Sequence, residues 1–231
     1  MRIAVISDIH GNLLALDAVM TDLERHHPDE IWCGGDIAWG GPGHWASECV
    51  ARVRQAGWPA VRGNTDVWVT GDPQTLEGEA DREEVRTMAA AHNLSEDDAR
   101  WLLGLPLGHS GPGSILLVHG TPETPFDAPM PDAPAADFTP YLGQAAIVIY
   151  GHVHHAFMRR LSDGTIVCNP GSVGFPEDDE TASYMLIDLE GPEWVIRMRR
   201  VPFDRRGGIA QARAVGGPVG ERFLLRMGAN R

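Results

Sequence analysis

Short apolar runs recur along the chain, and most are rich in β-branched residues and end at a glycine or a polar residue. Runs of this length and composition are typical of buried strands. The strands that they predict lie at residues 3–6, 31–33, 60–61, 115–118, 147–150 and 166–168.

Helical patterns separate the early strands. One apolar stripe with helical spacing contains Leu13, Leu16, Val19, Met20 and Leu23, and a weaker one contains Trp45, Cys49, Val50 and Val53. Residues 81–91, and the stretch that begins with the N-cap residue Ser95, are also expected to be helical. The order strand, helix, strand predicts a mixed sheet with crossover helices.

The pattern becomes mostly β from residue 147 onward. Ser162-Asp163-Gly164 predicts a hairpin turn, and Gly191-Pro192 predicts a break between strands at 184–189 and 195–199. Gly207-Gly208 and Gly216-Gly217-Pro218 interrupt the tail, which predicts two short, loosely held helices. Five prolines in residues 121–134 predict a stiff loop. We therefore expect a layered α/β fold in one domain over residues 1–231, with a core at 1–190 and a C-terminal strand and helical tail at 191–231.

Composition narrows the function classes. A chain of 231 residues with 43% hydrophobic residues can bury a substantial core. Its formal charge of −13 argues against a broad nucleic-acid-binding surface. Three widely spaced cysteines without a CxxC pair argue against a disulfide framework or a zinc ribbon. No apolar stretch resembles a signal peptide or a membrane span, so we expect a cytoplasmic protein without membrane contact.

Metal-ligand residue types follow nearly every predicted strand. In chain order they are Asp8 and His10, Asp36, Asn64, His119, and His152 with His154. If the strands share one layered structure, their carboxyl ends lie along one edge, where ligands bind in such folds. Carboxylate, imidazole and amide ligands together suit Mn²⁺, Fe, Ni²⁺, Co²⁺ or Zn²⁺.

The order D-x-H, G-D, G-N-x-D, H and G-H-x-H resembles the calcineurin-like metallophosphoesterase superfamily over roughly residues 1–188. His119-Gly120-Thr121-Pro122 and Asn169-Pro170-Gly171-Ser172-Val173-Gly174 are similar to its small bacterial and archaeal phosphodiesterase branch. The resemblance implies a central β-sandwich flanked by helices, with two divalent metal ions. It assigns Asp8, His10 and His154 to one ion, Asn64, His119 and His152 to the other, and Asp36 as the bridge.

The expected function is hydrolysis of a phosphate ester. Two divalent ions, with Mn²⁺ the first candidate, and two aspartates leave a charge of about +2, which attracts a phosphate anion. A metal-bridging hydroxide would attack phosphorus, and a small, nucleotide-like phosphodiester is the favoured substrate. A phosphomonoesterase or protein phosphatase remains an alternative, and so does a non-catalytic scaffold, although the complete ligand set favours an enzyme. The sequence carries no signal for an oligomeric state.

One position departs from the family pattern. Many phosphatases of the superfamily have histidine after the asparagine, whereas this chain has Thr65, which cannot act as a general acid at neutral pH. We therefore expect a leaving group that needs little protonation, or another acid such as His44 or His155.

Further residues are candidates for the substrate site. Asp66 keeps the acid of the family motif and is assigned a catalytic role, with capping of the next helix as the open alternative. Asn12 opens the first helix and is expected to bind a phosphate oxygen, together with Thr65 and His44. The loop at 39–44 and the proline-rich loop are expected to rim the metal edge.

Overall fold

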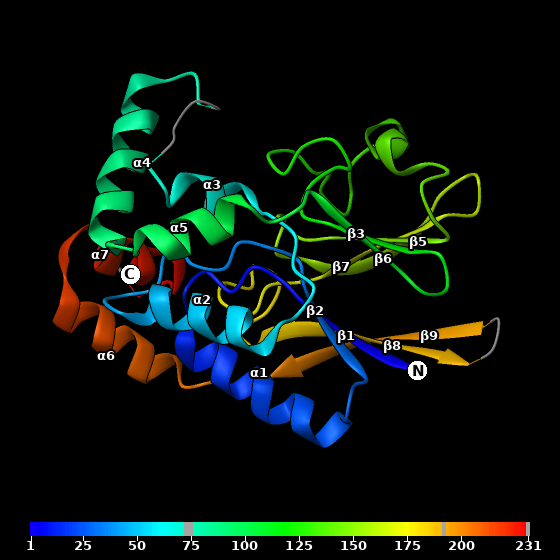
Figure 1. Cartoon of the computed structure of the whole chain (residues 1–231), viewed down its shortest axis with the longest axis horizontal. Coiled ribbons are helices and arrows are strands. Elements are labelled where there is room, and N and C mark those ends of the chain that lie inside the picture. Colours follow the sequence, from blue (N-terminus) through cyan, green and yellow to red (C-terminus); the bar gives the residue numbers. More distant parts are fainter. Residues whose placement is uncertain (72–75, 191–192, 230–231) are drawn as a thin grey trace.

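The computed structural model describes residues 1–71, 76–190 and 193–229, and two β-sheets form its centre (Figure 1). The four-stranded sheet has the order β2-β1-β8-β9, with β1 (Arg2–Ile6), β2 (Glu30–Cys33), β8 (Ala182–Glu190) and β9 (Glu193–Val201). The five-stranded sheet has the order β3-β4-β5-β7-β6, with β3 (Gly108–Gly111), β4 (Ile115–Val118), β5 (Ile147–Tyr150), β6 (Ala156–Arg160) and β7 (Ile166–Pro170).

The alternation of side chains along β1 shows how the layers are built. Ile3 and Val5 pack into the core between the two sheets, where they meet apolar residues of the five-stranded sheet such as Leu117. Ala4 and Ile6 point to the other face and join the core beneath the helices. Because both faces of β1 are covered, its sequence is a continuous apolar run rather than an alternating one.

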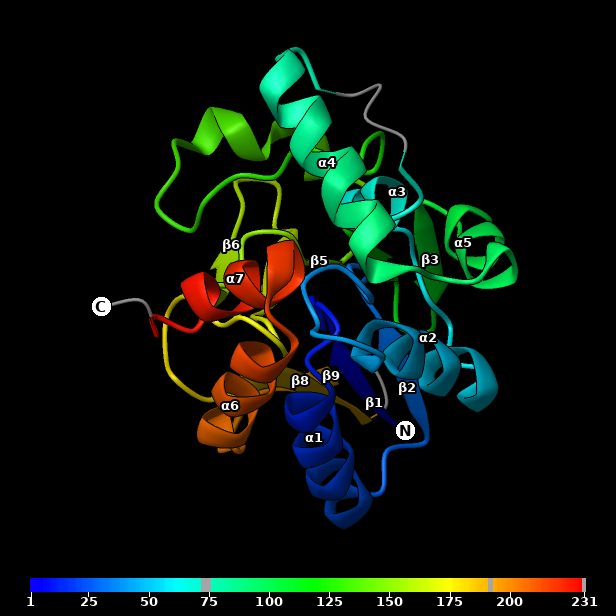
Figure 2. The same ribbon diagram turned by 90° about the vertical axis from the view of Figure 1, so that its left-hand side faces the viewer.

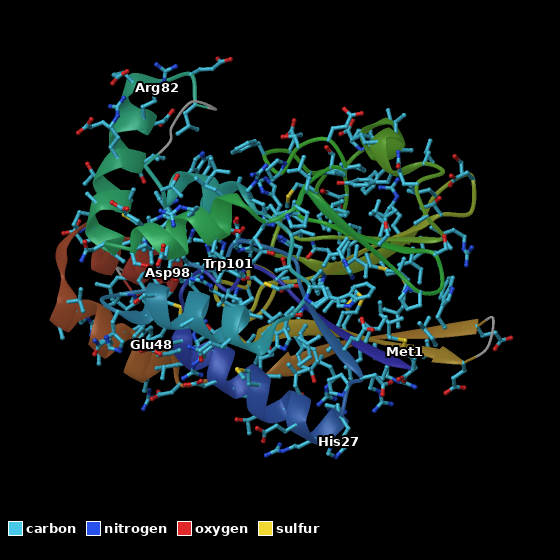
Figure 3. The ribbon with its side chains drawn as sticks, viewed as in Figure 1. Met1, His27, Glu48, Arg82, Asp98 and Trp101 are labelled. Atoms are coloured by element: carbon cyan, nitrogen blue, oxygen red, sulfur yellow. The ribbon has the colours of Figure 1, made fainter. Side chains whose placement is uncertain are left out.

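Helices cover the outer faces of the sheets. The helix α1 (Leu13–His26) packs on β8 and β9 of the four-stranded sheet, and α2 (Trp45–Ala56) packs on α1. To one side of the sheets, further helices pack on one another, namely α3 (Asn64–Trp68), α4 (Glu79–His92), α5 (Glu96–Leu103), α6 (Arg205–Val215) and α7 (Gly217–Arg226). The 3-10 helix η1 (Ala135–Tyr141) covers the five-stranded sheet through Phe138 and Tyr141. Polar residues such as Glu48 lie on the outer helix faces (Figure 3). None of the described helices is long and apolar enough to cross a bilayer.

The layered α/β arrangement with two sheets and flanking helices is confirmed. Of the six strands predicted from apolar runs between residues 3 and 168, five form. The strand predicted at residues 60–61 was wrong. Ala60 makes only an isolated bridge with Cys33, because the chain turns at Gly63 into α3 two residues after Val61. The sequence also gave no sign of β3, which is a short, partly exposed edge strand. The predicted break at 191–192 lies outside the described residues.

The tail forms two short helices that separate at Gly216, as predicted, but two other parts of its prediction were wrong. Gly207-Gly208 does not interrupt α6, because Asp204 caps this helix by accepting a hydrogen bond from Gly207 N–H at 2.9 Å. Gly208 lies against the ring of Phe223, so the glycine permits close packing of α6 on α7. Neither helix is loosely held, since Ala212 and Phe223 are fully buried.

Candidate metal centre

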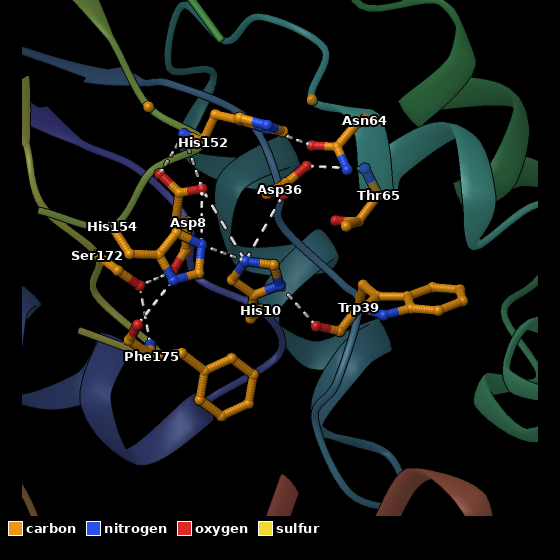
Figure 4. Close-up of polar contacts among 12 residues, drawn as sticks. Asp8, His10, Asp36, Trp39, Asn64, Thr65, His152, His154, Ser172 and Phe175 are labelled. Atoms are coloured by element: carbon orange, nitrogen blue, oxygen red, sulfur yellow. Dashed lines mark hydrogen bonds and ion pairs between the residues drawn. The ribbon is translucent and has the colours of Figure 1, made fainter. Parts of the chain in front are cut away.

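The predicted metal ligands meet at one edge of the two sheets. Asp8 and His10 follow β1, Asp36 follows β2, His119 follows β4, and His152 and His154 follow β5, while Asn64 is the first residue of α3. Figure 4 shows how six of them turn toward one another. Six of the seven are buried, and His152 is half-buried. The structure therefore brings together side chains that are as far as 146 residues apart.

Five of these residues have a strained backbone. Left-handed φ angles occur at Asp8 (56°), His10 (50°), Asp36 (55°), His152 (68°) and His154 (60°). Such angles are uncommon outside glycine, and each costs about 1–3 kcal/mol. Hydrogen bonds between loops hold the conformation, including Asp8 N–H to Gly35 O at 3.0 Å and His10 N–H to Asp36 O at 2.9 Å. The fold maintains this strain at the positions where side chains must converge.

Two histidines present lone pairs to the same point. The Nδ1 of His10 lies 2.8 Å from Trp39 O, and the Nδ1 of His154 lies 2.7 Å from Phe175 O. A carbonyl oxygen only accepts, so each Nδ1 carries the proton and each neutral ring keeps its lone pair on Nε2. The two Nε2 atoms are 3.0 Å apart. Ligands about 2.1 Å from one ion and at right angles to each other are about 3.0 Å apart, so this pair fits a shared cation.

The second half of the site shows the same arrangement. His119 Nδ1 lies 2.7 Å from Gly34 O, so its Nε2 faces Asn64 Oδ1 at 3.0 Å. His152 Nδ1 lies 2.9 Å from the same oxygen. The amide oxygen of Asn64 can only accept, and it therefore needs a proton or a cation between itself and these rings.

Asp36 lies between the two halves. Its Oδ2 is 3.6 Å from His10 Nε2, and its Oδ1 is 3.4 Å from His119 Nε2. Two groups of possible ligands have all their ligand atoms within 4.8 Å of one another: Asp8 with His10 and His154, and Asp8 with Asp36 and His119. The donor set of carboxylates, imidazoles and an amide oxygen fits divalent transition-metal ions.

The electrostatics of the cluster match this chemistry. Burial would raise the pKa of Asp36, but His119 outweighs burial and lowers it, and His154 does the same for Asp8. Both carboxylates therefore stay ionised. Burial would lower the pKa of His119, but Asp36 raises it to about 10. Protons and metal ions thus compete for the same buried lone pairs.

Two glycines allow the loops to approach so closely. A Cβ on Gly63 would lie 2.0 Å from Asp36 Oδ1, and one on Gly151 would lie 2.7 Å from Asp8 Oδ2. Any side chain at these positions would displace a ligand carboxylate.

Asp66 is fully buried behind the cluster rather than in the cavity in front of it. Its carboxylate accepts hydrogen bonds from the backbone N–H groups of Asp36 (2.9 Å), Ile37 (2.9 Å) and Gly63 (2.8 Å). Burial and the charge of Asp36 raise its pKa to about 7. These contacts favour a positioning role, in which Asp66 ties the Asp36 loop to the start of α3. Its sequence-based catalytic role stays a prediction.

A cavity of about 350 Å³ lies over the cluster. It is lined by His10, Asp36, Trp39, Asn64, Thr65, Trp68, His152, His154, Phe175, Arg222 and Arg226. Thr65 is 5% exposed, and its Oγ1 has no hydrogen-bond partner among the described residues. A buried hydroxyl that faces a cavity without a partner is suited to a ligand atom.

Other predicted substrate residues lie elsewhere. Asn12 caps α1, with Oδ1 accepting from Ala15 N–H at 3.3 Å and Nδ2 donating to Gly174 O at 2.8 Å. His44 is exposed at the start of α2, and His155 does not line the cavity. Of the loop at 39–44, only Trp39 lines it.

The proline-rich loop does not line the cavity either, although the ring centroid of its Phe126 lies 6.2 Å from that of Trp68. Sequence reasoning missed Trp68, Phe175, Arg222 and Arg226. The apolar spacing of Val219, Phe223 and Met227 was a signal that α7 docks on the core.

The fold and the site together define a metal-dependent phosphoesterase. Residues 1–191 match the family model described as the calcineurin-like phosphoesterase superfamily domain, and the chain belongs to this superfamily. An uncharacterized protein of Methanocaldococcus jannaschii is 30% identical over 222 residues, which are 87% of this chain and 88% of that protein.

Solved structures agree with this assignment. A metallophosphoesterase from Sphaerobacter thermophilus is 29% identical, with a TM-score of 0.77 and coverage of 100% of this chain and 99% of that one. A hypothetical protein from Pyrococcus horikoshii shares the fold at 20% identity, with a TM-score of 0.76 and coverage of 96% and 97%. Both matches extend beyond residue 191, where the family model ends.

Metal ions should stabilise the folded chain, because they neutralise facing acceptors that the backbone holds under strain. A divalent ion at about 100 times its dissociation constant adds about 2.7 kcal/mol, which for this size raises Tm by about 5–10 °C. Differential scanning fluorimetry with chelator and then with Mn²⁺ or Zn²⁺ measures this shift. Asp36→Asn should lose most of it, whereas Asp97→Asn, on the exposed surface of α5, should keep it. An unchanged Tm with every ion tried would contradict the metal centre.

Asp66→Ala should destabilise the fold, because three buried N–H groups lose their acceptor at a cost of about 1–3 kcal/mol each. We expect the free energy of unfolding to fall by about 3 kcal/mol or more. Urea unfolding of chelator-treated protein tests this, with Asp97→Ala as the control. Full stability with lost turnover would instead support a catalytic role for Asp66.

Proposed function

We propose that this chain hydrolyses phosphodiesters with two divalent cations, of which Mn²⁺ is the first candidate. Asp8, His10 and His154 would hold one ion, and Asn64, His119 and His152 the other, with Asp36 between them. The observation that carries the proposal is the convergence of buried carboxylates and histidine ring nitrogens beneath one cavity. When bound, the ions supply an activated water nucleophile and neutralise charge on the phosphoryl oxygens.

The chain's own groups fix the ligand geometry. Backbone carbonyls at Trp39, Phe175 and Gly34 orient the rings of His10, His154 and His119 through their Nδ1–H groups. Such outer contacts set the tautomer and raise the basicity of the ligating nitrogen. The N–H of His152 lies 3.2 Å from both oxygens of Asp8 and holds that carboxylate in place.

Thr65 is the substrate-binding residue that the structure favours most. Its N–H donates to Asp36 Oδ1 at 2.9 Å, which places the side chain directly beside the bridging position. Its orphaned Oγ1 would donate a hydrogen bond to a phosphoryl oxygen.

The cavity favours a diester with a stable leaving group. Among its described lining residues, every carboxylate and imidazole is also a candidate metal ligand, so no side chain is left to protonate the leaving group. The walls formed by Trp39, Trp68 and Phe175 offer apolar surface to an organic substituent on each side of the phosphate. Aromatic rings stack on nucleobases, so a nucleotide-like ester fits this space.

Purified protein should hydrolyse bis-p-nitrophenyl phosphate with Mn²⁺ and should stop when a chelator is added. Because Asp36 belongs to both halves of the site, Asp36→Asn should lower kcat/KM by about 100-fold or more. The ratio of rates on bis-p-nitrophenyl phosphate and p-nitrophenyl phosphate should favour the diester. A faster monoester would instead select the monoesterase alternative. Absence of metal-dependent turnover on both esters would leave the scaffold alternative.

Thr65→Val keeps the volume of the side chain but removes Oγ1. We expect kcat/KM for the diester to fall about tenfold or more, because a hydrogen bond to a charged group contributes about 1.5–3 kcal/mol. Thr65→Ser retains the hydroxyl and should stay close to the wild type. If Val and Ser variants showed equal activity, Oγ1 would have no role at the phosphate.

A further inference from the structure

One wall of the cavity comes from a helix outside the family range of residues 1–191. Helix α7 lies between α4 and α6 (Figure 2). Its residues Arg222 and Arg226 line the same cavity as His10 and Asn64. Within the part of the chain that the structure describes, no other arginine lines this cavity.

The packing of α7 explains why both arginines face the cavity. Val219, Phe223 and Met227, four residues apart, form the buried stripe of the helix. The centroid of the Phe223 ring lies 6.0 Å from that of Trp45 and 5.4 Å from that of Phe175. This contact fixes the rotation of the helix about its axis. Arg222 and Arg226 each precede a stripe residue by one position and therefore share the neighbouring flank.

Phe175 connects this helix with the metal ligands. The centroid of its ring also lies 5.3 Å from that of His10, and its carbonyl oxygen accepts a hydrogen bond from His154 Nδ1 at 2.7 Å. A single residue thus contacts both the buried stripe of α7 and two candidate metal ligands. The arginine pair and the metal cluster are therefore two parts of one cavity.

Each arginine is held by one carboxylate near the surface. Arg222 Nη1 donates to Glu84 at 3.3 Å, and Arg226 Nη1 donates to Glu177 at 2.6 Å. Each of these bonds engages one terminal nitrogen of a guanidinium that has five N–H donors. Burial and the neighbouring charge of Arg226 lower the pKa of Arg222. An anion beside both groups would relieve this repulsion.

The cavity offers more groups that can bind an anion than one diester requires. Two divalent ions and two aspartates already leave about +2, whereas a phosphodiester carries a single negative charge. The arginine pair adds two guanidinium groups beside the cavity, and each is paired with a glutamate through only one nitrogen, in a protein with a formal charge of −13. The remaining N–H donors of these groups point to a second anionic group on the substrate.

We propose that Arg222 and Arg226 form a subsite for a second phosphate group, so that the preferred substrate is a phosphodiester that also carries a terminal phosphate. This inference rests on the proposed phosphodiesterase function. A guanidinium binds phosphate through two parallel N–H···O bonds, which suits a terminal phosphate with three free oxygens. Trp39 and Trp68 would contact the organic part of the substrate between the two phosphates.

Two matched esters test the subsite in the Mn²⁺-loaded protein: thymidine 5′-(4-nitrophenyl phosphate) and the same compound with a 3′-phosphate. The wild type should show a KM about tenfold or more lower for the 3′-phosphorylated ester. The double variant Arg222→Gln/Arg226→Gln should lose this difference in KM between the two esters. Arg213→Gln, exposed on α6, is the matched control and should behave as the wild type.

Calorimetry provides a readout that does not need turnover. Thymidine 3′,5′-bisphosphate should bind the wild type about tenfold or more tightly than thymidine 5′-monophosphate, and the double variant should bind both alike. Equal KM values for the two esters in the wild type, which require no variant, would overturn the subsite and leave the phosphodiesterase intact. Absence of turnover on both esters would overturn the proposed function, and the calorimetric comparison would then decide the subsite alone.

Discussion

The site depends on one electrostatic constraint. Buried nitrogen and oxygen atoms that can accept a proton or a cation face each other, at about the distance that separates two ligands of one metal ion. His10 and His154 place their Nε2 atoms 3.0 Å apart, and His119 faces Asn64 Oδ1 at the same distance. Lone pairs at this separation repel each other unless positive charge lies between them. The second ring nitrogens cannot relieve the conflict, because backbone carbonyls already bind them. A cation bound at this cluster would therefore couple its binding to folding.

The two sheets make the constraint possible by ending several strands at one edge. The chain leaves β1, β2 and β5 through left-handed residues, which turn the side chains inward. A loop alone would not hold this conformation against its strain. Asp66 contributes from behind, since its three backbone contacts join the Asp36 loop to Gly63. The rigid positions of the ligands thus follow from ordinary hydrogen bonds around them.

The sequence predicts those parts of the molecule in which local pattern and position coincide. Apolar runs that end in glycine and a ligand residue define the strand ends, and the order of Asp8, Asp36 and His119 identifies the family. Ala60 and Val61 were misassigned because a run of two apolar residues cannot show whether a neighbouring strand continues beside it. Gly207-Gly208 has the pattern of a helix break, but Asp204 caps the helix there and the ring of Phe223 lies against Gly208.

The remaining residues depend on contacts that no local pattern contains. The side chain of Asn12 is not free to bind phosphate, because its Nδ2 donates a hydrogen bond to the carbonyl oxygen of Gly174, 162 residues away. The orientation of Arg222 depends on the contact of Phe223 with Trp45 and Phe175, in segments distant along the chain. Such long-range packing appears only in the folded structure.

The cavity contains one group of side chains that attracts cations and another that attracts anions. On one side, buried carboxylates and ring nitrogens are suited to cations, and on the other, two arginines with remaining N–H donors are suited to an anion. The side chains that attract cations lie at strand ends, where the backbone is fixed by both sheets. The arginines lie on α7, which is positioned by one aromatic cluster. Substitutions on α7 can therefore change which anion is bound without disturbing the ligands, because Phe223 rather than either arginine holds the helix in place. Under the proposed function, the sheets would supply the chemistry and α7 would select the substrate.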